Sequence, residues 1–407
     1  MLIKGLSKTA LLVGTLDTKG EEYLFAKNRF NQAGIKTIII DAGILGSPKL
    51  TPDYSNEVVA HAGGVELKEL ISKANRGSAV SAMTKGVLKT VQELFSKGEF
   101  GGIFALGGSS GSAISSAAMR SLPIGVPKIL VSTLVGQNAD AYVGQSDIAL
   151  FASVVDIAGI NRISSRVIAN AVDAMIGMLN GGEIDKKIEK KIVAASMFGV
   201  TTQCVTQARK ELEEAGLEVI TFHMTGNGGM AMEKLITDGL VDAVLDVTTT
   251  ELCDEIIGGI LSAGPTRLTA AVKKNIPQVI SLGALDMVNF GPKKTVPEKF
   301  KDRKLYVHNE NVTLMRTTPN ECRAIALDIC NKLKGVKART ALIVPLLGIS
   351  AIATKGQPFY DPEADEVLFS TIREHLPKEV ELIELELAIN DSDFSSALVA
   401  KLLSYLK

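Results

Sequence analysis

The stretch FALGGSSGSAISSAAM gathers small and hydroxylated residues where an apolar run ends and a helical pattern begins. Glycine lets a backbone approach a ligand closely, and hydroxyls with the free N–H groups of a helix start are donors that phosphate oxygens accept. The stretch has neither the P-loop pattern nor the GxGxxG fingerprint. Capping and close helix–sheet packing explain such a turn about as often as an anion site does. The candidate phosphate-binding residues are Gly107, Gly108, Ser109, Ser110, Gly111 and Ser112.

The stretch GTLDTKGEE, at the end of the first apolar run, is a second candidate site. Lys19 can meet a phosphate, and Asp17 can hold a ribose hydroxyl or a metal ion. In the alternative interpretation Thr18 caps a helix whose first turn carries Glu21 and Glu22, which satisfies the capping chemistry. Capping does not explain Lys19, because a cation near a helix start opposes the helix dipole.

Apolar runs that alternate with helical patterns must position these turns. In the first half, strands are predicted at 9–14, 36–41, 101–108 and 127–133, with helices at 21–34, 79–97, 112–120 and 163–179. Such alternation predicts parallel strands joined by crossover helices. A Gly-Gly break and a charged run at 181–191 predict a linker. We therefore expect an α/β fold of two Rossmann-like domains, 1–182 and 183–407, each a mostly parallel sheet flanked by helices.

The second half repeats this architecture without repeating the sequence, and it ends on helices predicted at 320–333, 363–375 and 392–406. In open parallel sheets, ligands bind beyond the carboxyl ends of the strands. The turns TGNGG and TTTELCDE are assigned to such ends, and they predict a site for a second, acidic or phosphorylated ligand. Its candidate residues are Thr225, Gly226, Gly228, Gly229, Thr249, Thr250 and Glu251.

Two further stretches, GALDMVNFG (283–291) and HNENVTLMRTT (308–318), are assigned to turns of the same kind. They supply the candidate catalytic residues Asp286, His308 and Arg316, and Arg267 is a candidate for pairing with an anion. A lone histidine is more often a structural residue than a catalyst, roughly two to one by the usual burial of histidine.

The composition excludes several functional classes. A formal charge of −1 provides no basic field for nucleic acid. No apolar run reaches about 18 residues, and the N-terminus lacks a signal-peptide pattern, so no membrane span is expected. The four cysteines, Cys204, Cys253, Cys322 and Cys330, lie far apart and are expected in the core. They indicate neither a zinc site nor a disulfide framework, and we expect a cytoplasmic protein without a metal centre of that kind.

Several long stretches resemble the UPF0261 (Tm-1-like) family, among them VGTLDTKGEE, VVDIAGINRIS, MFGVTTQCV and LDVTTTELCDEIIGGILSAGPTRL. The resemblance covers residues 9–406. It implies an ATP-binding protein of two Rossmann-like subdomains, often a homodimer, and Mg²⁺ is a candidate companion of the nucleotide. It implies that the nucleotide binds in the N-terminal half. The matching positions are Thr15, Asp17, Thr18, Lys19, the loop Gly107–Ser112, Ser132 and Thr133.

This chain departs from the family pattern at three positions. Ser110 stands where the family usually has glycine, and Ser112 where it usually has threonine. Gln145 likewise stands where threonine is common. A side chain in place of glycine hinders the close approach of the backbone to a phosphate. Ser110 therefore affects the predicted nucleotide site.

Three functions are consistent with these residues. The first is an ATP-dependent metabolic enzyme with a substrate cleft between the two domains. The second is a nucleotide-dependent regulatory protein that engages a protein partner without turnover. The third is a module that binds a sugar acid or a similar anion and no nucleotide.

Overall fold

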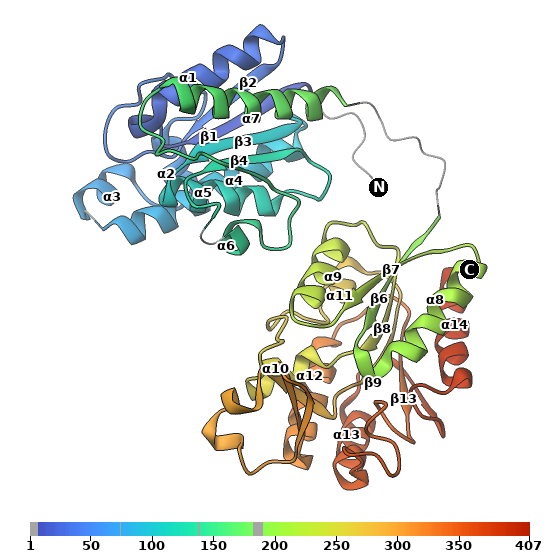
Figure 1. Ribbon diagram of the computed structural model, residues 1–407. Helices are drawn as coiled ribbons and strands as arrows, with labels where there is room; N and C mark the ends of the chain where they lie inside the picture. The colour runs from blue at the N-terminus through green and yellow to red at the C-terminus, as the bar shows by residue number, and fades with distance from the viewer. Residues whose placement is uncertain (1–6, 74, 137–138, 182–189) are drawn as a thin grey trace. The chain divides into compact units, whose positions relative to one another are not determined.

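The computed structural model describes residues 7–73, 75–136, 139–181 and 190–407 (Figure 1). The chain forms two compact units, Met1–Asp185 and Lys186–Lys407, each with its own sheet. The predicted domain boundary after residue 182 and most of the linker predicted at 181–191 lie outside the described residues. Both units are Rossmann-like α/β structures, as the sequence predicts. No described helix combines the length and the apolar character that crossing a lipid bilayer requires.

The N-terminal unit is built on five parallel strands in the order β2-β1-β3-β4-β5. The strands are β1 (Thr9–Gly14), β2 (Lys36–Asp41), β3 (Gly102–Gly107), β4 (Lys128–Ser132) and β5 (Ala149–Ala152). The helices are α1 (Leu16–Gln32), α2 (Asn56–Ala62), α3 (Leu67–Lys73), α4 (Arg76–Ser96), α5 (Ser109–Ser121), α6 (Ala139–Val143) and α7 (Arg162–Asn180). The short edge strand β5 is absent from the prediction, because its four half-exposed residues form no recognisable apolar run.

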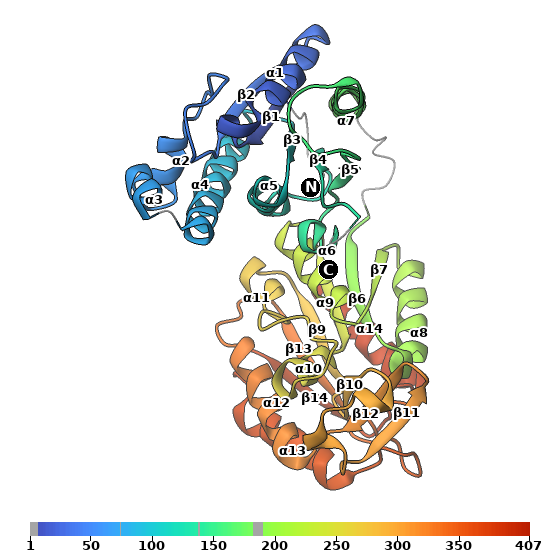
Figure 2. The ribbon, with the colours of Figure 1, turned by 60° about the vertical axis from the view of Figure 1, so that its left-hand side comes forward.

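Helices cover both faces of this sheet, which explains why its central strands are apolar throughout. In β1, Leu12 packs with Phe30 of α1, while Leu11 packs with Met83 of α4. Helices α1 and α7 therefore lie on one face and α2, α4 and α5 on the other (Figure 2). Because crossover helices run antiparallel to the strands, the helix starts gather at the carboxyl edge of the sheet.

The strand order changes direction between β1 and β3. From β1 the chain continues to β2 on one side of the sheet, and from β3 it continues to β4 on the other side. Such a switch point is where open α/β sheets bind ligands. The pairing of β1 with β3 ends at Val13 and Ala105, and the side chain of Tyr23 fills the gap between the two strands beyond that point. Its hydroxyl accepts from Leu106 N at 2.9 Å and donates to the Val13 carbonyl, so it replaces the strand pairing that ends there.

The C-terminal unit is built on six parallel strands in the order β14-β13-β9-β8-β6-β7, which is the order of the first unit with one strand added. Its switch point lies between β6 and β8. The strands are β6 (Ile192–Met197), β7 (Glu218–His223), β8 (Ala243–Thr248), β9 (Gln278–Gly283), β13 (Thr340–Pro345) and β14 (Glu381–Leu385). The shared order confirms the predicted repetition of architecture between the two halves.

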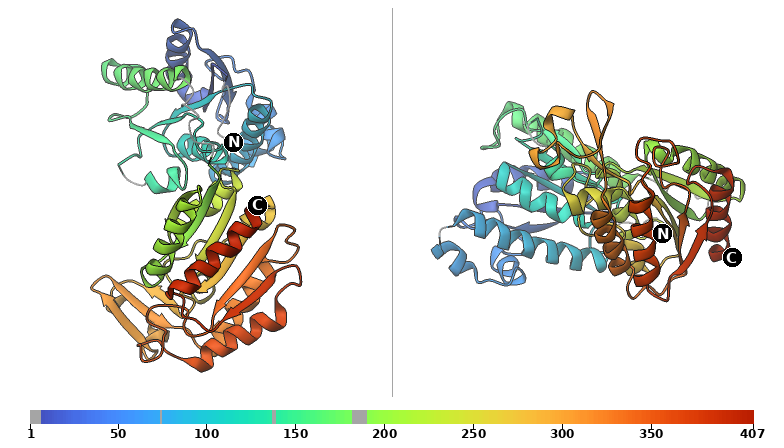
Figure 3. Two further views of the ribbon diagram at one scale, coloured as in Figure 1. Left: turned by 90° about the vertical axis from the view of Figure 1, so that its right-hand side faces the viewer. Right: turned by 90° about the horizontal axis from the view of Figure 1, so that it is seen from below.

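Seven helices flank the second sheet: α8 (Thr202–Glu214), α9 (Asn227–Thr237), α10 (Glu251–Ile257), α11 (Ala270–Lys274), α12 (Pro319–Lys332), α13 (Pro362–His375) and α14 (Ser392–Leu406). Helices α8 and α14 pack on one face, and α9, α11, α12 and α13 pack on the other (Figure 3). The helices predicted at 320–333, 363–375 and 392–406 are confirmed within one residue at each end.

A three-stranded antiparallel sheet interrupts the strand–helix alternation between β9 and α12. Its strands are β10 (Met287–Phe290), β11 (Leu305–Asn309) and β12 (Val312–Arg316), in the order β10-β12-β11. The assignment of 283–291 and 308–318 wholly to strand-to-helix turns is therefore wrong. Four- and five-residue strands carry too little periodicity to be recognised, because they are stabilised by their pairing partners.

Candidate functional site

The loop Gly107–Ser112, at the carboxyl end of β3, contains two glycines that the chain itself does not require. A Cβ on Gly107 would lie 3.3 Å from Gly111 Cα, so packing accounts for that glycine. A Cβ on Gly108 or on Gly111 would meet no atom closer than 3.9 Å, and neither residue has a positive φ. Since neither packing nor conformation demands them, these two positions leave open space at the start of α5.

The hydroxyls of this region divide into two groups. Ser112 Oγ and Ser132 Oγ lie 2.8 Å apart and are buried, so they tie α5 to β4 inside the unit. Ser109 is exposed, and Thr133 Oγ1 lies 3.9 Å from the position of a Cβ on Gly108. Of the four, Ser109 and Thr133 are therefore the ones accessible to a ligand.

The stretch Thr15–Lys19 follows β1 on the other side of the switch point. The N-cap of α1 is Thr15, not Thr18, so the predicted capping role of Thr18 is wrong. The reason is that α1 begins directly after the strand; Thr18 Oγ1 instead lies 3.0 Å from Thr15 Oγ1. Lys19 has a non-helical backbone (φ −124°, ψ 19°), and its Nζ donates to the carbonyl of Ile157.

In both Asp17 and Asp41, one carboxylate oxygen accepts hydrogen bonds from the backbone and the other oxygen is buried. Asp17 Oδ2 accepts from Leu45 N at 2.6 Å, and Asp41 Oδ1 accepts from Leu16 N at 3.0 Å and Gly43 N at 2.8 Å. No described residue hydrogen-bonds to the buried Asp17 Oδ1 or Asp41 Oδ2. Burial raises the pKa of Asp41, and the nearby charge of Asp17 raises it further.

These two oxygens suit either of two partners. A ribose hydroxyl can donate to a carboxylate at the end of the second strand of such a sheet. A hard cation such as Mg²⁺ prefers the same oxygen ligands, so Asp17 and Asp41 are the residues that would hold it. Gly43 makes the arrangement possible, because a Cβ there would lie 2.6 Å from Asp17 Cγ.

Arg76, the first residue of α4, is missing from the residues predicted by sequence. Its Nε and Nη2 donate to Ser110 Oγ at 3.2 and 3.0 Å, which brings a guanidinium to the loop Gly107–Ser112. No sequence signal marks it, since a single arginine 34 residues before Ser110 belongs to no motif. Ser110 Oγ is the acceptor of both hydrogen bonds.

The glycine turn of the C-terminal unit differs from the loop Gly107–Ser112, because the chain fills it with its own carboxylate. Glu251 Oε1 accepts from Gly226 N at 2.8 Å and from Gly229 N at 3.0 Å, and its side chain is fully buried. A Cβ on Gly229 would lie 1.9 Å from that carboxylate, and one on Gly228 would lie 1.8 Å from the His223 carbonyl. Gly226 has a φ of 84°. Packing and conformation thus account for all three glycines.

The threonines of the predicted second-ligand set also have partners within the chain. Thr225 Oγ1 donates to the His223 carbonyl at 3.3 Å, and Thr249 Oγ1 donates to the Ser281 carbonyl at 3.2 Å. Thr250 and Thr249 are fully buried. The structure therefore brings the TGNGG turn and Glu251 together. The groups predicted to hold a second ligand are instead hydrogen-bonded to other groups of the chain.

Arg267, fully buried, neutralises the carboxylates beneath this turn. Its Nη1 lies 2.6 Å from Asp246 Oδ2, its Nε lies 2.8 Å from Glu251 Oε2, and Glu233 lies 3.5 Å away. Burial raises the pKa of both glutamates, and the charge of Arg267 opposes that rise. The anion predicted to pair with Arg267 is therefore internal to the chain.

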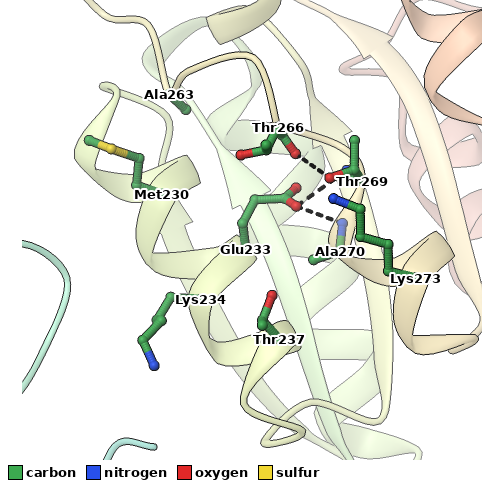
Figure 4. A pocket seen from close by; sticks show the side chains of 9 residues that line it. All are labelled: Met230, Glu233, Lys234, Thr237, Ala263, Thr266, Thr269, Ala270 and Lys273. Atoms are coloured by element: carbon green, nitrogen blue, oxygen red, sulfur yellow. Dashed lines mark hydrogen bonds between the residues drawn. The ribbon is translucent and has the colours of Figure 1, made fainter. Parts of the chain in front are cut away.

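A surface pocket of about 290 Å³ lies between α9 and α11 (Figure 4). Glu233 forms its floor, and this carboxylate accepts from Thr269 N at 3.2 Å and Ala270 N at 2.8 Å. The remaining lining residues are Met230, Lys234, Thr237, Ala263, Thr266 and Lys273. None of the predicted site residues lines it.

The three candidate catalytic residues do not gather in one place. Asp286 and Arg316 lie close together, because β10 and β12 pair Met287 with Arg316. Asp286 Oδ2 accepts from Ser350 Oγ at 2.8 Å, and Asp286 is fully buried. Arg316 Nη2 lies 2.6 Å from Asp365 Oδ1. His308 is exposed on β11, opposite residues 312–313 of β12 and away from Arg316.

Comparisons with known proteins cover nearly the whole chain. The model of the N-terminal domain of the uncharacterised protein family UPF0261 matches residues 8–183, and the model of its C-terminal domain matches residues 190–406. A UPF0261 protein from Clostridium tetani is 48% identical over 403 residues, which cover 99% of this chain and 100% of that protein. The ToMV resistance protein Tm-1(GCR237) from Solanum lycopersicum is 38% identical over 417 residues, covering 97% of this chain and 55% of that protein.

Among solved structures, UDP-N-acetylglucosamine 2-epimerase from Rickettsia bellii is 13% identical, with 68% of this chain and 79% of that chain covered. The TM-score of 0.23 is too low to relate the binding site of that enzyme to this chain.

Proposed function

The chain belongs to the UPF0261 family, and from this premise and the open carboxyl edge of its first sheet we propose that the N-terminal unit binds ATP between β1 and β3. The observation that carries the proposal is the pair Gly108 and Gly111. Both keep open space that neither packing nor a positive φ requires, and Gly111 lies inside α5, where glycine costs about 1 kcal/mol relative to alanine. A ligand that approaches the backbone closely explains both.

The proposed contacts follow from the chemistry of the two turns. Phosphate oxygens accept from the free N–H groups of the first turn of α5, with Ser109 and Thr133 as hydroxyl donors. Lys19 leaves the Ile157 carbonyl for a phosphate, because a charged acceptor makes the stronger hydrogen bond. Asp17 and Asp41 take the ribose hydroxyls or a Mg²⁺ ion through their unpaired oxygens.

Two activities are compatible with ATP binding: an ATP-dependent enzyme, and a nucleotide-dependent regulatory protein that binds a partner without turnover. An ATP-dependent enzyme needs reactive side chains that reach a substrate. Asp286 and Arg316 are buried in contacts with Ser350 and Asp365, so such an enzyme would use other residues. Phosphate release from ATP and Mg²⁺, measured alone and with a panel of small acids, distinguishes the two: sustained release supports the enzyme.

Alanine in place of the two open glycines tests the ATP site. We expect Gly108→Ala and Gly111→Ala to weaken ATP binding at least tenfold in calorimetry, because the new Cβ occupies the space of the phosphate. The free energy of unfolding rises by up to about 1 kcal/mol in Gly111→Ala, since the apo chain has room for a methyl group inside α5. It falls by less than about 1 kcal/mol in Gly108→Ala, because glycine is a better N-cap than alanine.

The matched control is Gly177→Ala on α7, where a Cβ also meets nothing within 4 Å. This variant gains similar stability and keeps the affinity of the wild type. The proposal fails if the wild-type protein shows neither heat nor a thermal shift with ATP, or if both loop variants bind ATP as the wild type does.

A further inference from the structure

We propose that Arg76, held by Ser110, binds the phosphate tail of the nucleotide and makes the N-terminal unit selective for nucleoside triphosphates over nucleosides. This inference rests on the proposed ATP site. Arg76 is the first residue of α4, and the side chain of Asn75 caps that helix by accepting from Ser78 N at 3.0 Å. The cap fixes the helix start, and the guanidinium reaches the loop Gly107–Ser112 from there.

The partner of Arg76 is a weak one for a guanidinium. Both donating nitrogens, Nε and Nη2, use the same neutral hydroxyl, Ser110 Oγ. Among the described residues no carboxylate pairs with Arg76. Arg29 in the same unit shows the ordinary arrangement, with Nε 2.6 Å from Asp173 Oδ1 and Nη2 paired with Asp173 Oδ2. A planar guanidinium with five N–H donors pairs best with two oxygens of one anion.

The helix starts around Arg76 also lack a negatively charged side chain. The first turns of α4 and α5 contain no acidic residue. The starts of these two helices therefore add positive potential to the charge of Arg76. In the C-terminal unit the start of α9 is satisfied by Glu251 of the chain itself. A phosphate group is the ligand that supplies the missing charge at Arg76.

Space for that group exists beside the guanidinium. A Cβ on Gly77 would have Asn75 Oδ1 as its nearest neighbour, at 3.4 Å, and Gly77 has no positive φ. Gly77 and Gly111 therefore leave the starts of α4 and α5 accessible. Ser110 consequently acts as a positioning residue, because its hydroxyl holds the guanidinium at the loop.

Calorimetry with ATP and adenosine, on the full-length chain, tests this assignment. We expect Arg76→Ala to weaken ATP binding 10- to 100-fold, the usual size of a charge-assisted contact, and adenosine binding less than threefold. The dependence of ATP affinity on salt concentration becomes shallower in this variant, which a purely structural role would not cause. Arg76→Lys restores part of the ATP affinity.

Ser110→Gly tests the positioning role. It weakens ATP binding by an intermediate factor, and the double variant Ser110→Gly/Arg76→Ala is no weaker than Arg76→Ala alone, because Ser110 acts through Arg76. Arg29→Ala is the control, since it removes the same charge from the far end of α1. Thermal unfolding of each variant verifies that it folds.

The outcomes separate this inference from the proposed function. If the wild-type protein binds ATP and Arg76→Ala binds it equally well, Arg76 has no role and the ATP site stands. Equal losses in Arg76→Ala and Arg29→Ala also overturn the inference, since they indicate a general effect of net charge. If the wild-type protein does not bind ATP, the proposed function and this inference fail together.

Discussion

At the scale of the residue, the glycines of the two units differ in what occupies the space of a missing side chain. Gly228 and Gly229 are required because the His223 carbonyl and the Glu251 carboxylate occupy the space of their side chains. Gly108 and Gly111 are not required by any atom of the chain. The residue type is the same in both turns, so only the surrounding atoms distinguish a packed turn from an open one.

Asp254 on α10 gives the C-terminal unit a pH-dependent stability. Burial raises its pKa from 3.8 to about 7, although hydrogen bonds from Asn289 oppose the rise. The unfolded chain releases this proton near pH 3.8 and the folded chain near pH 7. The folded state therefore binds more protons in this window, and stability falls as the pH rises through it.

We expect Asp254→Asn to reduce the fall in unfolding free energy between pH 5 and pH 8, measured by urea unfolding. Part of the fall remains, because burial also raises the pKa of Asp365, to about 6. Asp302→Asn, at an exposed position, is the control and leaves the pH dependence as in the wild type. An unchanged slope in Asp254→Asn would show that this carboxyl does not carry the effect.

At the scale of the element, the gap between β1 and β3 depends on α1. Strand pairing between β1 and β3 stops at Val13 and Ala105, and the Tyr23 hydroxyl then serves the backbone of Leu106 and Val13. Gly14 accommodates the ring, since a Cβ there would lie 2.1 Å from it. The helix thus completes the hydrogen bonding of the sheet at the carboxyl ends of β1 and β3.

Tyr23→Phe removes this hydroxyl and leaves a buried N–H and a buried carbonyl without their partner. We expect the N-terminal unit to lose about 1–3 kcal/mol of unfolding free energy, measured by urea unfolding. Tyr360→Phe changes the same group at a 39% exposed position of the other unit and should stay within about 0.5 kcal/mol of the wild type. Equal stability of Tyr23→Phe and the wild type would contradict the role assigned to the hydroxyl.

At the scale of the whole molecule, each unit has hydrophobic clusters of its own. The clusters around Leu11 and Leu12 contain residues of the first unit, and those around Leu282 and Leu245 contain residues of the second. We therefore expect the two units to unfold in separate transitions, since proteins of more than one domain depart from two-state unfolding.

Two perturbations should therefore act on different transitions in calorimetric unfolding of the full chain. From the proposed ATP site, we expect ATP at about 100 times its Kd to stabilise the N-terminal unit by about 2.7 kcal/mol. Arg267→Met leaves the carboxylates of Asp246 and Glu251 buried without their cation and destabilises the C-terminal unit by about 3–5 kcal/mol.

Arg209→Met, which breaks an exposed ion pair with Glu213 in the same unit, is the control and should cost less than about 1 kcal/mol. A shift of both transitions by ATP, or by Arg267→Met, would contradict the independence of the two cores.

The amino-acid sequence by itself determined the α/β class and the alternation of strands and helices. Long apolar runs such as those of β1 and β3 can be recognised in the sequence because both faces of each strand are buried. Capping boxes such as Thr318 with Glu321 mark helix starts by local chemistry alone. The turns with ligand-type residues followed from the same local patterns.

Tertiary structure alone decided which of those turns are neighbours and which are already filled. The order of the strands places the ends of β1 and β3 at one switch point, and no local pattern encodes that order. The contacts of Glu251 with Gly226 and of Arg76 with Ser110 join residues 25 and 34 positions apart. Such pairings form only when distant segments pack, so the same glycine-rich motif becomes a closed turn in one unit and an open edge in the other.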